Sequence, residues 1–316
     1  MKRSLKLLAA AVFAAATSTA FAQNYPSRPV TMVVPFPPGG NTDLMARALQ
    51  TELAKALNQS VIISNKGGAA GTIGILDLVR AEPDGYTMAM TPNNPITAQP
   101  HMQPNLRYGM DTFRYICLTY YTPYVLIAGP QAPFKTFAEF VTFAKAKPEN
   151  VVYGHPGVAG QPHLVMLSVL KAIGADGLGV PFQGAGPMSH ALLGGTIMAI
   201  TESPAVARAS NLPILAAISG ERIPGLPDVP TMKELGFPAV GFSAGGLIVP
   251  ARTPDAAAAV LEKACAAATA APEYKAIVER LGAEPRYLPG DRFRKMFDED
   301  SVASADAIKR AGLGAR

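Results

Sequence analysis

One stretch near the N-terminus combines a buried strand, a glycine turn and the start of a helix. Val30–Val34 is an apolar run, residues 35–40 are rich in proline and glycine, and Asn41 opens a segment with apolar residues at helical spacing. This order brings unpaired backbone N–H groups and the positive end of a helix dipole to the end of a strand. The stretch therefore predicts a site that binds an anion through backbone groups.

A second candidate chemistry is nucleophilic catalysis at Ser243. Residues 241–245 read Gly-Phe-Ser-Ala-Gly and match the G-x-S-x-G nucleophile elbow. That elbow requires a helix after the serine and a histidine later in the chain. The segment after Ser243 is strand-like and ends at Pro250, and all four histidines precede it: His101, His155, His163 and His190. A glycine-flanked strand is the favoured interpretation.

Cofactor and metal motifs are missing from the sequence. Gly154, Gly157 and Gly160 are spaced three apart, which differs from the dinucleotide fingerprint, and no Walker loop with its lysine occurs. His155 and His163 could bind a metal only together with further ligands, and the sequence has no cluster of cysteines or carboxylates to supply them. We therefore predict neither a cofactor nor a metal site.

The strand–loop–helix pattern recurs along the chain and positions these residues. Further strands are predicted at residues 61–64, 86–90, 151–153, 180–182, 197–201 and 214–218. Right-handed crossovers make such strands parallel, so the loops after them meet at one sheet edge, where ligands bind. Because the pattern occurs in both halves, we predict an α/β clamshell whose two lobes close on a small ligand.

Two long apolar runs are predicted to cross between these lobes, at residues 114–129 and 240–250. Each lobe is expected to contain a mostly parallel sheet flanked by helices. We assign residues 23–122 plus 243–316 to lobe 1 and residues 123–242 to lobe 2. A short helix is predicted at residues 232–235, and the C-terminal helices are expected to pack back on lobe 1.

The first 22 residues read as a signal peptide. Three cations precede an apolar run at residues 7–16, and Ala20-Phe-Ala22 is a cleavage signal. The run is shorter than the roughly 20 residues of a membrane span, so we predict export to the periplasm with cleavage after Ala22.

Charge and cysteine content narrow the function classes. The net charge of +5 falls to +2 without the three cations of the signal, which excludes a nucleic-acid surface. Cys117 lies in an apolar strand-like run and Cys265 in an alanine-rich helix. An oxidising compartment permits a bridge between them, but two buried thiols are the favoured interpretation.

Several distinctive motifs occur in order along the mature chain, among them Val34-Pro-Phe-Pro-Pro-Gly-Gly-Asn-Thr-Asp43, Asn65-Lys-Gly-Gly-Ala-Ala-Gly-Thr-Ile-Gly74 and Leu226-Pro-Asp-Val-Pro-Thr231. These motifs resemble those of the periplasmic substrate receptors of tripartite tricarboxylate transporters. The resemblance implies a periplasmic-binding-protein-like fold without enzymatic activity. It also implies that the protein captures an organic acid and delivers it to a two-component integral membrane permease. A monomer is expected.

Three segments of lobe 1 are expected to donate hydrogen bonds to the ligand. They are the anion-binding loop, the helix start near Ala69 and the loop after the third strand. Neutral donors suffice for a carboxylate, because each charge-assisted hydrogen bond contributes about 1.5–3 kcal/mol. The predicted ligand residues of this lobe are Phe36, Pro38, Gly39, Gly40, Asn41, Thr42, Asp43, Ala69, Ala70, Gly71, Thr72, Thr91 and Asn93.

Lobe 2 departs from the family pattern. Where relatives have Ser-x-Gly-x-Gly-Ser-x-x-His, residues 155–163 read His-Pro-Gly-Val-Ala-Gly-Gln-Pro-His, and Phe182-Gln-Gly184 replaces Tyr-Lys-Gly. The lobe keeps hydrogen-bond donors but loses a cation and small hydroxyls. We therefore expect a monocarboxylate, an aromatic or linear dicarboxylate, or another acid bound partly by imidazole and amide groups, instead of citrate. The predicted ligand residues are His155, Gly157, Gln161, His163, Gln183 and Glu202.

A solute receptor is accordingly the favoured function. A periplasmic hydrolase that acts on an acidic substrate through Ser243 is the alternative. A third interpretation is a sensor that docks on a membrane kinase or another partner after it binds its ligand.

Overall fold

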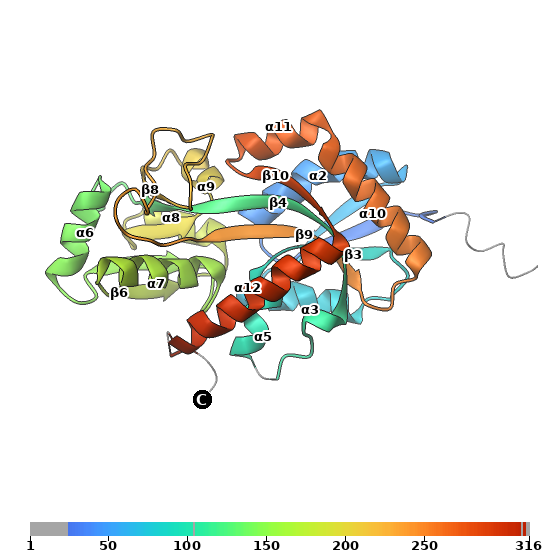
Figure 1. Cartoon of the computed structure of the whole chain (residues 1–316), viewed down its shortest axis with the longest axis horizontal. Helices are drawn as coiled ribbons and strands as arrows, with labels where there is room; N and C mark the ends of the chain where they lie inside the picture. The colour runs from blue at the N-terminus through green and yellow to red at the C-terminus, as the bar shows by residue number, and fades with distance from the viewer. Residues whose placement is uncertain (1–24, 104, 311, 314–316) are drawn as a thin grey trace, which may run out of the picture.

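The computed structural model describes residues 25–103, 105–310, 312 and 313, so the predicted signal peptide lies outside the described residues. Its strands form two groups that share one long central strand (Figure 1). The strands are β1 (Val30–Val34), β2 (Val61–Asn65), β3 (Thr87–Pro92), β4 (Phe113–Ala128), β5 (Val151–His155), β6 (Gly177–Pro181), β7 (Ala199–Glu202), β8 (Ile214–Ile218), β9 (Phe242–Pro250) and β10 (Glu284–Pro289).

In the first lobe, β1 lies between β2 and β3, and all three are parallel. Successive side chains of β1 point to opposite faces of this sheet, and both faces are covered, which explains why four of its five residues are apolar. Met32 packs in the cluster that contains α2 (Asn41–Leu57), whereas Val33 packs in the cluster that contains α3 (Thr72–Arg80).

The C-terminal helices cover this lobe, as predicted. α10 (Asp255–Ala270) and α11 (Pro272–Arg280) pack against α2 on one face. α12 (Gly290–Arg310) lies across the other face and contacts β4 and the short helices α4 (Asn94–Thr97) and α5 (Gln99–Met102) (Figure 1).

In the second lobe, β5 pairs in parallel with β6 and β7, and β7 and β8 pair antiparallel with the end of β4. A capping box at Thr136 and Glu139 opens the first helix of this lobe, because each side chain accepts from the other residue's backbone N–H. The helices are α6 (Phe137–Ala146), α7 (Gln161–Ile173), α8 (Ala185–Leu193) and α9 (Pro204–Ala209).

Two crossing strands join the lobes. β4 is 16 residues long and pairs antiparallel with β9. The pairing runs from Phe113, which is opposite Pro250, to Pro123, which is opposite Phe242. Its first part belongs to the first lobe, and its last part, from Tyr124, pairs within the second. The two-lobed α/β fold with crossing strands is therefore confirmed, while the residue boundaries of the lobes stay predictions.

Three details differ from the sequence-based expectations. Cys117 on β4 and Cys265 on α10 form a disulfide, so the prediction of two free thiols is wrong. α10 packs directly on β4 and brings the two Cα atoms to 6.6 Å, although 148 residues separate them in sequence. Residues 232–235 form a turn instead of a helix, and β10 was not predicted.

No helix in the part of the chain that the structure describes has the length and apolar character that a membrane crossing requires.

Candidate functional site

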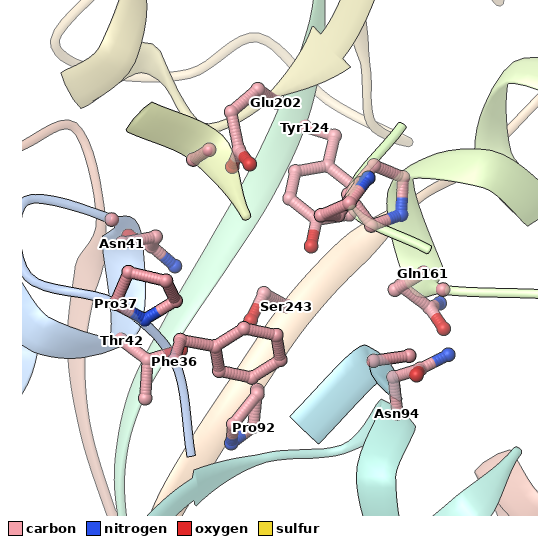
Figure 2. A pocket seen from close by; sticks show the side chains of 16 residues that line it. Phe36, Pro37, Asn41, Thr42, Pro92, Asn94, Tyr124, Gln161, Glu202 and Ser243 are labelled. Atoms are coloured by element: carbon pink, nitrogen blue, oxygen red, sulfur yellow. The ribbon is translucent and has the colours of Figure 1, made fainter. Parts of the chain in front are cut away.

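A cavity lies between the lobes, where several strands end (Figure 2). Pro92 and Glu202 are the last residues of β3 and β7, and Tyr124 and Ser243 lie on the crossing strands. This is the sheet edge where the parallel pattern places a ligand. The lining residues are Phe36, Pro37, Gly40, Asn41, Thr42, Ala70, Pro92, Asn94, Tyr124, Pro156, Gly160, Gln161, Pro162, Ala185, Glu202 and Ser243.

Three helices begin at this cavity, one from the first lobe and two from the second. Asn41, Gln161 and Ala185, the first residues of α2, α7 and α8, all line it. Each helix is preceded by a glycine, so no side chain caps its first turn. The unpaired N–H groups and the positive dipole ends therefore favour an anion in the cavity.

The described residues that line the cavity include no lysine, arginine or histidine. Their polar side chains are instead amides, hydroxyls and one carboxyl group. Both polar atoms of the Asn41 side chain and Oε1 of Gln161 are buried without a hydrogen-bond partner among the described residues. Figure 2 shows these two amides on opposite sides of the cavity. Because buried polar groups are normally paired, these atoms are available to a ligand.

Glu202 is the one acidic residue of the lining, and it is 5% exposed. Figure 2 shows its carboxyl group beside Tyr124. Burial raises the pKa of Glu202 to about 7, although the Ser203 N–H, which donates to its Oε1 at 2.7 Å, acts in the opposite direction. Burial, and then the Glu202 charge, raise the pKa of Tyr124 well above its ordinary value. At neutral pH, Glu202 is therefore divided between its neutral and charged forms.

Of the residues predicted for the first lobe, five line the cavity: Phe36, Gly40, Asn41, Thr42 and Ala70. Asp43 instead supports the loop. Its carboxylate accepts hydrogen bonds from the Gly39 N–H, Arg47 and Asn65, each at 2.9 Å. Burial alone would raise the pKa of Asp43, but these hydrogen bonds lower it, so the carboxylate stays charged and fixes residues 39–43.

The other residues predicted for this lobe lie outside the cavity lining: Pro38, Gly39, Ala69, Gly71, Thr72, Thr91 and Asn93. Asn93 shows why. Its amide donates to Asp300 of α12 at 3.0 Å, and Thr97 donates to the same carboxylate at 2.6 Å. The neighbours Pro92 and Asn94 line the cavity in its place.

In the second lobe, Gln161 and Glu202 line the cavity, whereas His155, Gly157, His163 and Gln183 do not. The two imidazoles hold their own loop instead. His155 Nδ1 lies 2.8 Å from the Gly157 carbonyl, and His163 Nδ1 accepts from the Ala159 N–H at 3.0 Å. The rings stack at 3.9 Å. Burial lowers the pKa of both, that of His163 to about 4, so both are neutral at pH 7.

Nine lining residues are not among the predicted ligand residues: Pro37, Pro92, Asn94, Tyr124, Pro156, Gly160, Pro162, Ala185 and Ser243. Six of them directly adjoin predicted residues, so the predicted loops border the cavity. Tyr124 had no signal, because only the crossing of β4 past the cavity exposes it to a ligand. Ser243 was considered for catalysis, but it lies near the start of β9, which continues to Pro250, so a strand follows the serine where a nucleophile elbow requires a helix.

The lobes touch around the cavity. The carbonyl of Ala159 accepts hydrogen bonds from Asn94 at 2.8 Å and from Gln99 at 3.2 Å. A Cβ atom added to Gly157, which has φ +133°, would lie 3.2 Å from the Cβ of Ala70 in the other lobe. The two lobes are therefore in direct contact beside the cavity, and glycine permits the close approach.

The chain matches the family model "Tripartite tricarboxylate transporter family receptor" over residues 45–313. It is 32% identical over 300 residues to the protein BugT of Bordetella pertussis, and the match covers 92% of this chain and 91% of BugT. Among solved structures, it is similar to the periplasmic binding protein BugD, with 30% identity and a TM-score of 0.85 over 92% of this chain and all of BugD.

A third similar protein is MatC of Rhodopseudomonas palustris, whose structure contains bound malate. It is 31% identical, with a TM-score of 0.82 over 90% of this chain and all of MatC.

Proposed function

Because the chain belongs to the tripartite tricarboxylate transporter receptor family, we propose that it captures an organic carboxylate between its lobes and delivers it to a two-component membrane permease. The observation that carries this proposal is the start of α2, α7 and α8 at one cavity whose described lining has no cation. Backbone N–H groups from both lobes can bind one anion there, at about 1.5–3 kcal/mol for each charge-assisted hydrogen bond. The malate in MatC supports a small carboxylate as the ligand.

In this proposal the ligand is a monocarboxylate or an aromatic or linear dicarboxylate. Asn41, Thr42 and Gln161 bind it directly, together with the backbone around Gly40 and Ala185. Asp43, His155 and His163 act by holding the loops that carry these groups. Contacts that both lobes make to one ligand stabilise the closed form relative to the open form, and the permease then recognises the closed form.

The proposal also places the protein in the periplasm, after removal of residues 1–22, as a monomer without enzymatic activity. The family membership and the neighbours described as periplasmic support this location.

Calorimetry on the mature protein, residues 23–316, with a panel of carboxylates tests the proposal. We expect saturable binding of one ligand per chain, and chromatography should recover the ligand unchanged. If the protein converts its ligand, and Ser243→Ala abolishes the conversion, the hydrolase replaces the receptor. A pull-down with the cognate permease, with and without ligand, tests the partner.

A further inference from the structure

The cavity lining offers two kinds of polar group. The starts of α2, α7 and α8 offer hydrogen-bond donors to an anion, whereas Glu202 offers a carboxyl group. No described residue other than Ser203 donates a hydrogen bond to Glu202. Asn41 and Gln161 add buried side-chain oxygens that have no partner among the described residues. A ligand that carries only acceptors would leave all of these oxygens unpaired.

The charge of Glu202 affects which ligands the cavity can bind. The ionisable groups beside Glu202 are the buried phenols Tyr120 and Tyr124 of β4, which carry no charge at neutral pH. The described lining has no cation that could offset Glu202. A dicarboxylate that bridges the lobes would place its second negative charge in the same cavity as this buried carboxyl group. Like charges repel strongly where water is excluded, so the site disfavours that ligand when Glu202 is ionised.

We propose that Glu202 determines the ligand class by accepting a hydrogen bond from the ligand's second polar group, an amide or amine N–H. The receptor then prefers carboxylates with such a group to dicarboxylates of the same length. This inference rests on the proposed function, because it assumes that one carboxylate group of the ligand binds to the N–H groups at the helix starts. A site built around a hydrogen-bond acceptor discriminates strongly against an analogue that lacks the donor, since a buried group is then left unpaired.

Matched probes test this inference at pH 8, where Glu202, with its pKa of about 7, is mostly ionised. One series comprises glutarate, glutaramate and 5-aminopentanoate; a second comprises succinate, succinamate and 4-aminobutanoate. Within each series, we expect the amide or the amine to bind at least about tenfold more tightly than the diacid. Affinities are measured by calorimetry on the mature protein.

Two variants show whether Glu202 is responsible. Glu202→Gln keeps the shape but removes the charge, so we expect the amine to lose about tenfold in affinity and the gap to the diacid to close. Glu202→Asp keeps the charge and should keep the order of preference. A thermal melt checks that each variant is folded. Glu202→Gln is expected to remain folded, because it removes a buried ionisable group.

Other outcomes would overturn the inference. A diacid that binds the parent protein at pH 8 at least as tightly as its amide and amine would do so, and would leave the proposed function intact. So would a preference for the amine over the diacid that survives Glu202→Gln, because this substitution removes the charge. If none of the six probes bound the folded parent protein, the inference would fail, and the wider carboxylate panel would then decide the proposed function.

Discussion

The two loops that face each other across the cavity use their polar side chains in opposite ways. The first-lobe loop, residues 36–43, presents Asn41 and Thr42 to the cavity and turns only Asp43 back toward its own backbone. The second-lobe loop, residues 155–163, turns both imidazoles toward its own backbone and presents only Gln161 among its long polar side chains.

This difference shows that a side chain suited to binding an anion can serve instead to shape the backbone that binds it. Loops after strands have few regular hydrogen bonds, so local side-chain-to-backbone bonds fix their conformation. Asp43 does this in the first lobe, and His155 and His163 do it in the second. Residues that contact a ligand and residues that hold the loop should therefore respond differently to substitution.

The largest effect is expected for Asn41→Asp, because it places a negative charge at the cavity end of α2, opposite an anionic ligand. We expect the affinity for the carboxylate to fall by about 100-fold or more. The protein should remain as stable as the parent, because an acidic residue suits the first turn of a helix. Calorimetry and a denaturant melt measure the two quantities.

Thr51→Asp is the matched control, because it adds the same charge to an exposed position of the same helix. Its affinity should stay within about twofold of the parent value. An Asn41→Asp protein that bound the carboxylate as tightly as this control would show that the start of α2 does not hold the anion.

A smaller effect is expected for Gly157→Ala, which acts on the contact between the loops. The new methyl group would meet Ala70 and would also strain a backbone with φ +133°. Closure should become less favourable, and the affinity should fall by about tenfold. Gly174→Ala is the control: it also introduces a positive-φ alanine, but nothing lies within 4 Å of its new methyl group. Equal losses in both variants would rule out a specific effect on closure.

His163→Asn should change the affinity by less than about fivefold at pH 7.5, because His163 holds the loop and does not line the cavity. Its stability effect depends on pH. The buried imidazole has a pKa of about 4, against 6.5 when unfolded. As the pH falls from 6.5 toward 4, the unfolded chain gains a proton that the folded chain excludes, so the parent loses up to about 3 kcal/mol of stability.

The asparagine variant should lose less stability over this pH range, since only His155 still contributes to the loop's titration. Denaturant melts at pH 7.5, 6 and 4.5 measure this. If the variant's stability depends on pH as steeply as the parent's, or if its affinity falls as far as that of Asn41→Asp, the two loops do not differ in the proposed way.

The smallest effect on binding is expected for the double variant Cys117→Ala with Cys265→Ala. This disulfide ties α10 to β4 within the first lobe, and neither cysteine lines the cavity. The free energy of unfolding should decrease by about 2–4 kcal/mol, while the affinity stays within about twofold. A large loss of affinity would mean that the first-lobe core transmits strain to the loop.

Much of the fold could be predicted from sequence, because the regular strand–loop–helix pattern carries it. The apolar run Val30–Val34 and the glycines before Asn41 were enough to predict the strand, the turn and the start of α2. β10 could not be predicted, because Glu284–Pro289 contains two prolines and charged residues and pairs only at an edge. The pairing of Cys117 with Cys265 depends on how α10 packs on β4, which sequence spacing does not encode.

Less of the candidate site was accessible to sequence reasoning. The loops at the cavity were identified, but which side chain of a loop faces the cavity depends on local hydrogen bonds. Asp43 and His163 are turned away by such bonds, and Tyr124 and Ser243 reach the cavity only because the crossing strands pass beneath it. The resemblance to the receptor family identified the correct fold, which the family match confirms.

The most direct measurement is a crystal structure of the mature protein with the tightest-binding carboxylate from the panel. We predict that one carboxylate group lies within hydrogen-bond distance of the N–H groups at the start of α2 and also contacts the start of α7 or α8 in the second lobe. A ligand bound outside this cavity, or bound with its carboxylate away from all three helix starts, would contradict the proposed carboxylate receptor.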